Sequence, residues 1–202
     1  FQHDFSKYDI GSNTTIFSYF GKISGLKRTY ELVAAASEIK DKDFKIVFVT
    51  ETGQGADDFK NHAKKLDVLD KCIFLPFMPP WKIPPIMKAS TCIVCPESEE
   101  EPFLPKGTHG PQIAREAMAV GKPVIIGEGV KEKGMYKNTE DRKNILVVDP
   151  LDKDGFSNIL KFVIDNKEKM EEIGRNAREF SEDNENFKNY INSMENLFSS
   201  LL

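Results

Sequence analysis

The residues best suited to chemistry lie between positions 110 and 126. Gly110 and Pro111 precede a helical stretch, and Gly121 ends that stretch before a β-branched run. Proline at the first helical position and glycine just past the last are typical of helix ends. The free N–H groups and partial positive charge of a helix N-terminus favour an anion, typically a phosphate. Glu116, about one and a half turns further on, would lie near the group attached to that phosphate.

Six strand-like runs must position this helix. They cover residues 16–20, 45–49, 72–75, 91–95, 124–126 and 145–148, and the first four gaps hold helical patterns or longer loops. Such alternation predicts parallel strands. The runs are apolar on both faces, as expected when helices cover both sides of a sheet. We therefore expect an α/β fold with a doubly wound, mainly parallel, Rossmann-like sheet.

The predicted helices each carry an apolar face. After residue 150, three helical stretches around residues 156–163, 170–180 and 187–201 close the chain. Residues 53–55 are interpreted as a turn, because Asp58 stands where a dinucleotide-binding fingerprint needs its third glycine. Two of the apolar faces consist of Leu32, Ala35, Ala36 and Ile39, and of Phe59, Ala63, Leu66 and Leu69.

Composition excludes several classes of protein. The 202 residues, 40% of them apolar, suffice for one domain with a sizeable core. No apolar run approaches the roughly 18 residues of a membrane span, and the first residues lack the pattern of a secretory signal. The formal net charge of −4 argues against nucleic acid as a partner.

The cysteines at positions 72, 92 and 95 are interpreted as structural. Cys92 and Cys95 have a spacing known from zinc and redox motifs. They lie in a predicted strand, however, where residues three apart point to opposite faces, so one metal ion could not bind both without a bend. We expect small buried apolar side chains in a reducing compartment, and no metal site.

The order of the motifs resembles the C-terminal, nucleotide-sugar-binding domain of retaining glycosyltransferases with the GT-B fold, in the glycosyl transferases group 1 family. The resemblance runs over nearly the whole chain, residues 16–202. Residues 20–28, Phe-Gly-Lys-Ile-Ser-Gly-Leu-Lys-Arg, are similar to the family pattern G-R-L-S-x-x-K-G. Lys22 stands where the family usually has arginine, and Lys27 falls on the family's lysine.

A second and more specific stretch begins at Pro96. It resembles the family pattern P-S-x-x-E-x-F-G-x-x-x-x-E-A-M-A-x-G-K-P-V-I, with Glu116 on the second glutamate. The family separates its two glutamates by seven residues, and counting back from Glu116 reaches Thr108. Glu101 fits the first glutamate better, because Pro and Phe follow it. Residues 104–109 then form an apparent insertion.

Glu101 is thus one candidate for contact with the donor sugar. If Glu101 does not make this contact, His109 or Thr108 would face the sugar, or the protein uses a different sugar or none. The loop 96–110 exceeds the usual length of about 2–6 residues for such connections, which is typical of functional loops. We expect it to order as a lid when the donor binds.

The resemblance implies that the donor substrate is a nucleotide diphosphate sugar and that neither a cofactor nor a metal is needed. Lys22, Lys27 and the helix N-terminus would stabilise the departing diphosphate, and Glu116 would accept hydrogen bonds from the ribose. Phe77 and Met78 stand where the family places its nucleobase pocket, although the prolines around Trp81 could equally form a rigid structural loop. The predicted catalytic residues are Lys22, Lys27 and Glu101. The predicted binding residues are Gly21, Lys22, Lys27, Phe77, Met78, His109, Gly110, Pro111, Gln112, Ile113 and Glu116.

Because the chain begins with Phe1, we interpret residues 1–202 as the donor half of a hexosyltransferase-like enzyme whose N-terminal acceptor domain is absent. Such a half should bind donor but be inactive in transfer. The expected partners are the nucleotide sugar, the absent domain, and an acceptor sugar or lipid-linked glycan. We expect a cytoplasmic protein, with any membrane contact made through the absent half.

Two alternatives stay open. The altered glutamate spacing is compatible with a non-catalytic module that binds a nucleotide or nucleotide sugar. An unrelated doubly wound phosphoprotein or dinucleotide enzyme would share the fold, because fold does not determine function.

Overall fold

The computed structural model describes residues 8, 10–97, 110–184 and 187–200. Parallel strands form one six-stranded sheet in the order β3-β2-β1-β4-β5-β6. This order puts β1 beside both β2 and β4, which confirms the predicted doubly wound parallel sheet. Each predicted strand is present with its ends within one residue of the prediction. The strands are β1 (Thr15–Phe20), β2 (Phe44–Thr50), β3 (Cys72–Pro76), β4 (Cys92–Cys95), β5 (Val124–Gly127) and β6 (Leu146–Val148).

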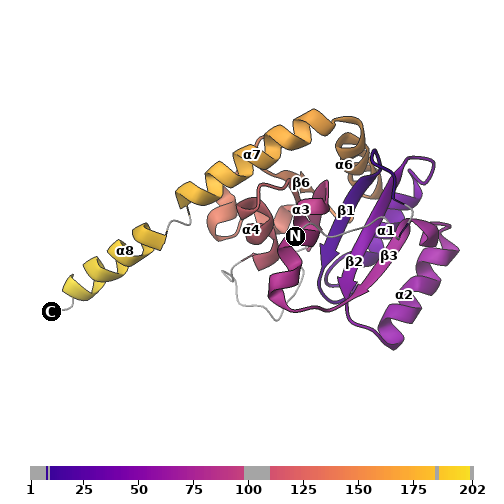
Figure 1. Cartoon of the computed structure of the whole chain (residues 1–202), viewed down its shortest axis with the longest axis horizontal. Helices are drawn as coiled ribbons and strands as arrows, with labels where there is room; N and C mark the ends of the chain where they lie inside the picture. The colour runs from indigo at the N-terminus through magenta and orange to yellow at the C-terminus, as the bar shows by residue number, and fades with distance from the viewer. Residues whose placement is uncertain (1–7, 9, 98–109, 185–186, 201–202) are drawn as a thin grey trace.

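Helices flank the sheet, and α8 extends away from the body beyond the end of α7 (Figure 1). On α8 the apolar side chains of Ile191, Leu197 and Phe198 are exposed. The helices are α1 (Thr29–Ser37), α2 (Gln54–Lys65), α3 (Ile83–Ala89), α4 (Gln112–Ala119), α5 (Glu128–Lys131), α6 (Lys153–Asp165), α7 (Lys167–Asn184) and α8 (Phe187–Ser200), with the short 3₁₀ turns η2 (Leu69–Lys71), η3 (Pro80–Lys82) and η4 (Gly134–Asn138). In the part of the chain that the structure describes, no helix is both long and apolar enough to cross a membrane.

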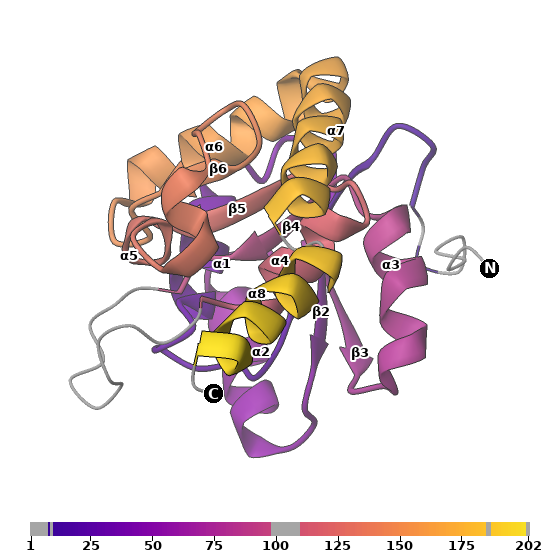
Figure 2. The ribbon, with the colours of Figure 1, turned by 90° about the vertical axis from the view of Figure 1, so that its left-hand side faces the viewer.

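The core lies on both faces of the sheet, as the apolar strands require. Helices α1, α2 and α6 pack on one face, where Phe17 and Phe48 are fully buried. Helices α3 and α4 pack on the other, against Ile93 and Ile126. Figure 2 shows α1 and α3 on opposite sides of the strands. Helix α7 contributes to the clusters on both faces through Ile173 and Ala177.

The three cysteines are free, and Cys92 and Cys95 lie on opposite faces of β4 as the strand period dictates. Both are buried. Burial raises the pKa of the Cys72 thiol to about 12, with a further contribution from the charge of Asp70. These thiols are therefore protonated at neutral pH and pack as small apolar groups.

Three local predictions need correction. The proline-rich segment after β3, for which a rigid loop was one interpretation, is largely helical: its prolines lie at the starts of η3 and α3, where a missing N–H costs nothing. Residues 53–55 are not a turn, because α2 begins at Gln54 and Gly53 precedes it at φ 118°. Pro111 is the residue before α4 rather than its first residue.

Two glycines bring α4 and α7 into backbone contact. Gly121 ends α4 at φ 76°, in the left-handed region that favours glycine. Gly174, inside α7, lies so close that a Cβ there would overlap the carbonyl oxygen of Gly121. Helix α4, which carries the predicted anion site, is thus held in place at its own C-terminal end by α7.

Candidate functional site

The candidate site lies where β1, β2 and β4 end on the same edge of the sheet. Lys22, Glu51 and Glu97 follow these three strands directly or within two residues. Because β1 and β4 are neighbours while their connections run in opposite directions, a crevice forms between the loops that follow them. In doubly wound sheets this is the usual place for a ligand.

An ion pair joins the two loops across this crevice. Lys27 Nζ donates to Glu97 Oε1 at 2.7 Å, and the lysine and glutamate side chains are 39% and 26% exposed. The ammonium group of Lys27 is therefore paired with a carboxylate from the loop after β4. Glu97 is not among the residues predicted from the sequence, although its position just after a strand and a proline was an available signal.

The turn after β1 is built by its glycine. Gly21 has φ 149°, and its N–H donates to the Val49 carbonyl at 3.0 Å. The phenol of Tyr19, a residue that sequence reasoning missed, donates to the Lys22 carbonyl at 2.7 Å. Burial raises the Tyr19 pKa well above its usual value, and the negative charge of Glu97 raises it further. The phenol thus stays protonated and holds the backbone of this turn.

Lys22 points more freely into solvent than Lys27. Its Nζ lies 4.0 Å from Glu51 Oε2, and the two side chains are 72% and 42% exposed. An ion pair this exposed contributes little to holding either group. Of the two predicted lysines, Lys27 is the one that the fold orients.

The N-terminus of α4 faces the same edge. Pro111 precedes the helix, and its carbonyl accepts a hydrogen bond from the Tyr136 phenol at 2.8 Å. Gly110 leaves no room for a side chain, since a Cβ there would lie 2.5 Å from Tyr136 Cε2. Within the helix, Gln112 Nε2 donates to Glu116 Oε1 at 3.0 Å. Glycine and tyrosine together set where the free N–H groups of the first turn lie.

We predict that Tyr136→Phe destabilises the protein by about 0.5–1.5 kcal/mol, the usual net contribution of one hydrogen bond. The change removes only the hydroxyl group that donates to the Pro111 carbonyl. Urea unfolding followed by circular dichroism checks the value. A variant with unchanged stability would mean that water replaces the phenol at no cost.

The electrostatics of Cys95 show that separate loops converge here. Burial raises its thiol pKa most, followed by the negative charge of Glu97 and a smaller effect of Glu116, while Lys27 lowers it. Three predicted or newly found charges, from the loops after β1 and β4 and from α4, therefore act on one buried atom. Lys27 and Glu97 are in direct contact at 2.7 Å, and the charge of Glu116 also acts on the end of β4.

Other predicted residues either follow a different strand or lie outside the described residues. Phe77 follows β3, two strands away from β1, and is 52% exposed, whereas Met78 packs against the core. Glu101, Thr108 and His109 lie outside the described residues, and so does most of the predicted lid. Among the residues that are described, no cluster of three or more His, Cys, Asp or Glu side chains could hold a metal ion.

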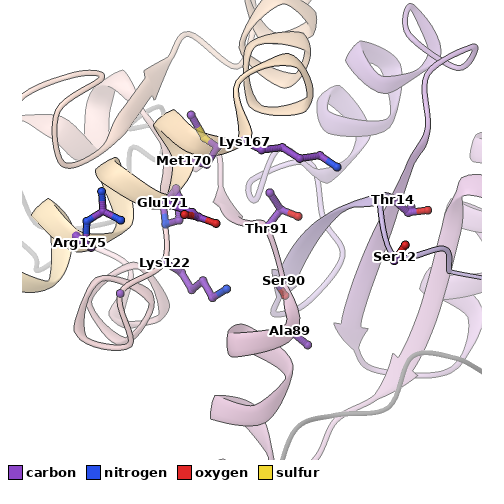
Figure 3. Close-up of a pocket in the computed structure, with 12 residues that line it drawn as sticks. Ser12, Thr14, Ala89, Ser90, Thr91, Lys122, Lys167, Met170, Glu171 and Arg175 are labelled. Atoms are coloured by element: carbon purple, nitrogen blue, oxygen red, sulfur yellow. The ribbon is translucent and has the colours of Figure 1, made fainter.

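An open cavity of about 690 Å³ lies at the opposite, amino-terminal edge of the sheet, so it is separate from this site (Figure 3). Several of its polar groups serve the protein's own structure: Thr91 accepts from the Ile16 N–H, Ser90 bonds to Ser18, and Lys167 donates to the Asn13 carbonyl. Burial lowers the pKa of Lys122 there. The chemistry predicted from sequence does not involve this cavity.

Comparison with known families identifies the chain. The family model described as "Glycosyl transferases group 1" matches residues 1–180. The chain belongs to this family. No curated protein matches it.

Solved structures of glycosyltransferases share the fold of this family member. HepE from Anabaena, in complex with UDP-glucose, superposes with a TM-score of 0.78 at 20% identity, covering 96% of this chain and 51% of HepE. Sucrose-phosphate synthase from Thermosynechococcus elongatus superposes with a TM-score of 0.79 at 21% identity, covering 97% of this chain and 47% of the synthase. The C-terminal domain of LpcC from Francisella tularensis superposes with a TM-score of 0.67 at 24% identity, covering 82% of this chain and 83% of that domain. The chain therefore spans about half the length of HepE and of sucrose-phosphate synthase, and its sheet matches the Rossmann-like half of a GT-B fold.

Proposed function

We propose that this glycosyltransferase-family chain is the donor-binding domain of a retaining enzyme that moves a sugar from a nucleotide diphosphate sugar to an acceptor hydroxyl. The observation that carries the proposal is the convergence of Lys27, Glu97 and Glu116 at the carboxyl edge of the sheet, beside the N-terminus of α4. The complexes of HepE with UDP-glucose, and with UDP and glucose, support the class of ligand.

In this proposal, the protein's main task is to stabilise the leaving group. The bond between the anomeric carbon and the diphosphate oxygen breaks, the acceptor oxygen bonds to that carbon, and the acceptor's proton passes to the departing diphosphate or to water. Negative charge then grows on the diphosphate. Lys27, the more exposed Lys22 and the N-terminus of α4 are cationic or partly cationic groups that need little rearrangement to meet it. These groups supply the compensating positive charge without a metal ion or a cofactor.

The acceptor would come from a second domain. Transfer requires that an acceptor hydroxyl be held against the sugar and that water be excluded, which one domain cannot do alone. We propose that an N-terminal domain of the same protein binds the acceptor, a sugar or a lipid-linked glycan, and closes over the donor. Residues 1–202 alone should therefore bind donor and transfer slowly.

The test is a calorimetric titration of the chain with UDP, GDP and ADP and with their glucose conjugates. Saturable binding of one base series supports the proposal, and no binding by any ligand overturns it. The protein carrying both domains is then assayed for transfer. Donor binding without transfer there would favour a non-catalytic binding module instead.

Within this proposal, Glu116→Gln should weaken the binding of the nucleoside diphosphate and of its sugar conjugate by a similar factor, about five- to tenfold. Glu116 would accept hydrogen bonds from the ribose, which both ligands contain, and the amide keeps the shape but loses the charge. Titration of both ligands measures the two factors. Weakening of the sugar conjugate alone would show that Glu116 contacts the sugar rather than the ribose.

A further inference from the structure

The carboxylate of Glu97 is paired with Lys27, the cation that the proposed donor needs. The carboxylate lies 2.7 Å from Lys27 Nζ, and neither side chain is fully exposed. In the register that puts Glu101 on the first glutamate of the family pattern, Ser98 falls on the pattern's serine and Glu97 falls on its proline. The carboxylate is therefore a feature of this chain and not of the pattern.

The position of Glu97 is set by its backbone. A Cβ on Gly127 would overlap the Glu97 carbonyl oxygen, so the end of β5 and the chain after β4 pack directly on each other. The buried phenol of Tyr19 and the thiol of Cys95 both sense the charge of Glu97. This loop thus holds the carboxylate close to the strand ends, where the diphosphate would lie.

We propose that Glu97 competes with the diphosphate for Lys27 and thereby favours release of the nucleoside diphosphate product over release of the donor. The inference rests on the proposed function. A lysine has one positive charge to share between the carboxylate and the ligand. Two anions held within several ångströms of each other repel strongly where water is partly excluded.

This repulsion acts more strongly on the product. In the donor the terminal phosphate is esterified to the sugar, whereas in the free nucleoside diphosphate it ionises a second time near pH 6, as phosphate monoesters do. The product therefore carries about one more negative charge at neutral pH. A fixed carboxylate beside Lys27 therefore weakens the binding of the product more than the binding of the donor.

The experiment compares Glu97→Gln with the wild-type chain. It measures affinity for the nucleoside diphosphate that binds best in the panel above, whether UDP, GDP or ADP, and for its glucose conjugate. We expect the diphosphate to bind about tenfold more tightly and the conjugate about threefold more tightly, with smaller gains in 0.5 M NaCl than in 0.05 M. The ratio of the two affinities is the decisive quantity.

Glu51→Gln is the matched control. It removes a carboxylate from the same sheet edge, but one that lies 4.0 Å from its lysine and is more exposed. We expect it to change either affinity by less than about twofold. Glu97→Ser, which also removes the carboxylate, should shift the ratio in the same direction as Glu97→Gln and serves if the glutamine variant fails to fold.

Weaker or unchanged binding of the diphosphate by folded Glu97 variants would overturn the inference, because Glu97 would then position Lys27 for the ligand. Equal gains for both ligands would also overturn it, since product and donor would not be distinguished. In either case the proposed function stands, because the wild-type chain binds. Absence of binding by the wild type and by every variant overturns both.

Discussion

Replacing Lys27 by alanine should weaken the binding of a nucleoside diphosphate by about 1.5–3 kcal/mol, or one to two orders of magnitude in Kd. The ammonium group of Lys27 would make hydrogen bonds to the diphosphate, and hydrogen bonds to charged groups are at the strong end of the range. The variant also leaves the half-buried Glu97 carboxylate without its 2.7 Å partner, so that the ligand meets an uncompensated negative charge. Calorimetry with the nucleoside diphosphate measures the loss.

Two further lysine variants show whether the effect is local. Lys22→Ala should cost less, because the Lys22 side chain is far more exposed and its nearest carboxylate is 4.0 Å away. Lys40→Ala removes a lysine that is also paired at 2.7 Å, with Asp67, at a distance from the site in sequence and in the fold. It should leave affinity unchanged. If folded Lys27→Ala binds as tightly as the wild type, the diphosphate does not use this lysine.

Gly174→Ala should destabilise the protein by about 1–3 kcal/mol, the range for overpacking a close contact. Inside a helix, glycine to alanine normally stabilises by roughly 0.5–1 kcal/mol. Here the added methyl would overlap the Gly121 carbonyl oxygen and press on Pro123. Since both are backbone or ring atoms, α4 and α7 must separate to make room.

Chemical denaturation of Gly174→Ala is best compared with that of Gly55→Ala. Gly55 also lies in a helix, α2, and a Cβ there would meet no atom within 4 Å. This control should be neutral or more stable by up to about 1 kcal/mol. Stabilisation by both substitutions would show that the two helices can move apart at no cost.

Local sequence patterns were enough to predict the sheet. Apolar runs on both strand faces, separated by helical patterns, indicate buried parallel strands because only helices on both sides can cover them. The motif at residues 110–126 likewise predicted α4 to within one residue, since proline and glycine restrict the backbone where they stand. The proline-rich segment after β3 was harder, because prolines suit a rigid loop and a first helical turn equally well.

The sequence alone determined the family, the doubly wound sheet and the candidates Lys22, Lys27 and Glu116, because these depend on residue types at short spacings. The order of the strands, and with it the meeting of distant loops, came only from the tertiary structure. Lys27 and Glu97 are 70 residues apart, and they form an ion pair because β1 and β4 are neighbours that end at the same edge. The roles of Tyr19, Tyr136 and Gly174 depend in the same way on which atoms lie within van der Waals or hydrogen-bond distance. No local pattern encodes such distances, since they are set by how the packed elements exclude one another from the same space.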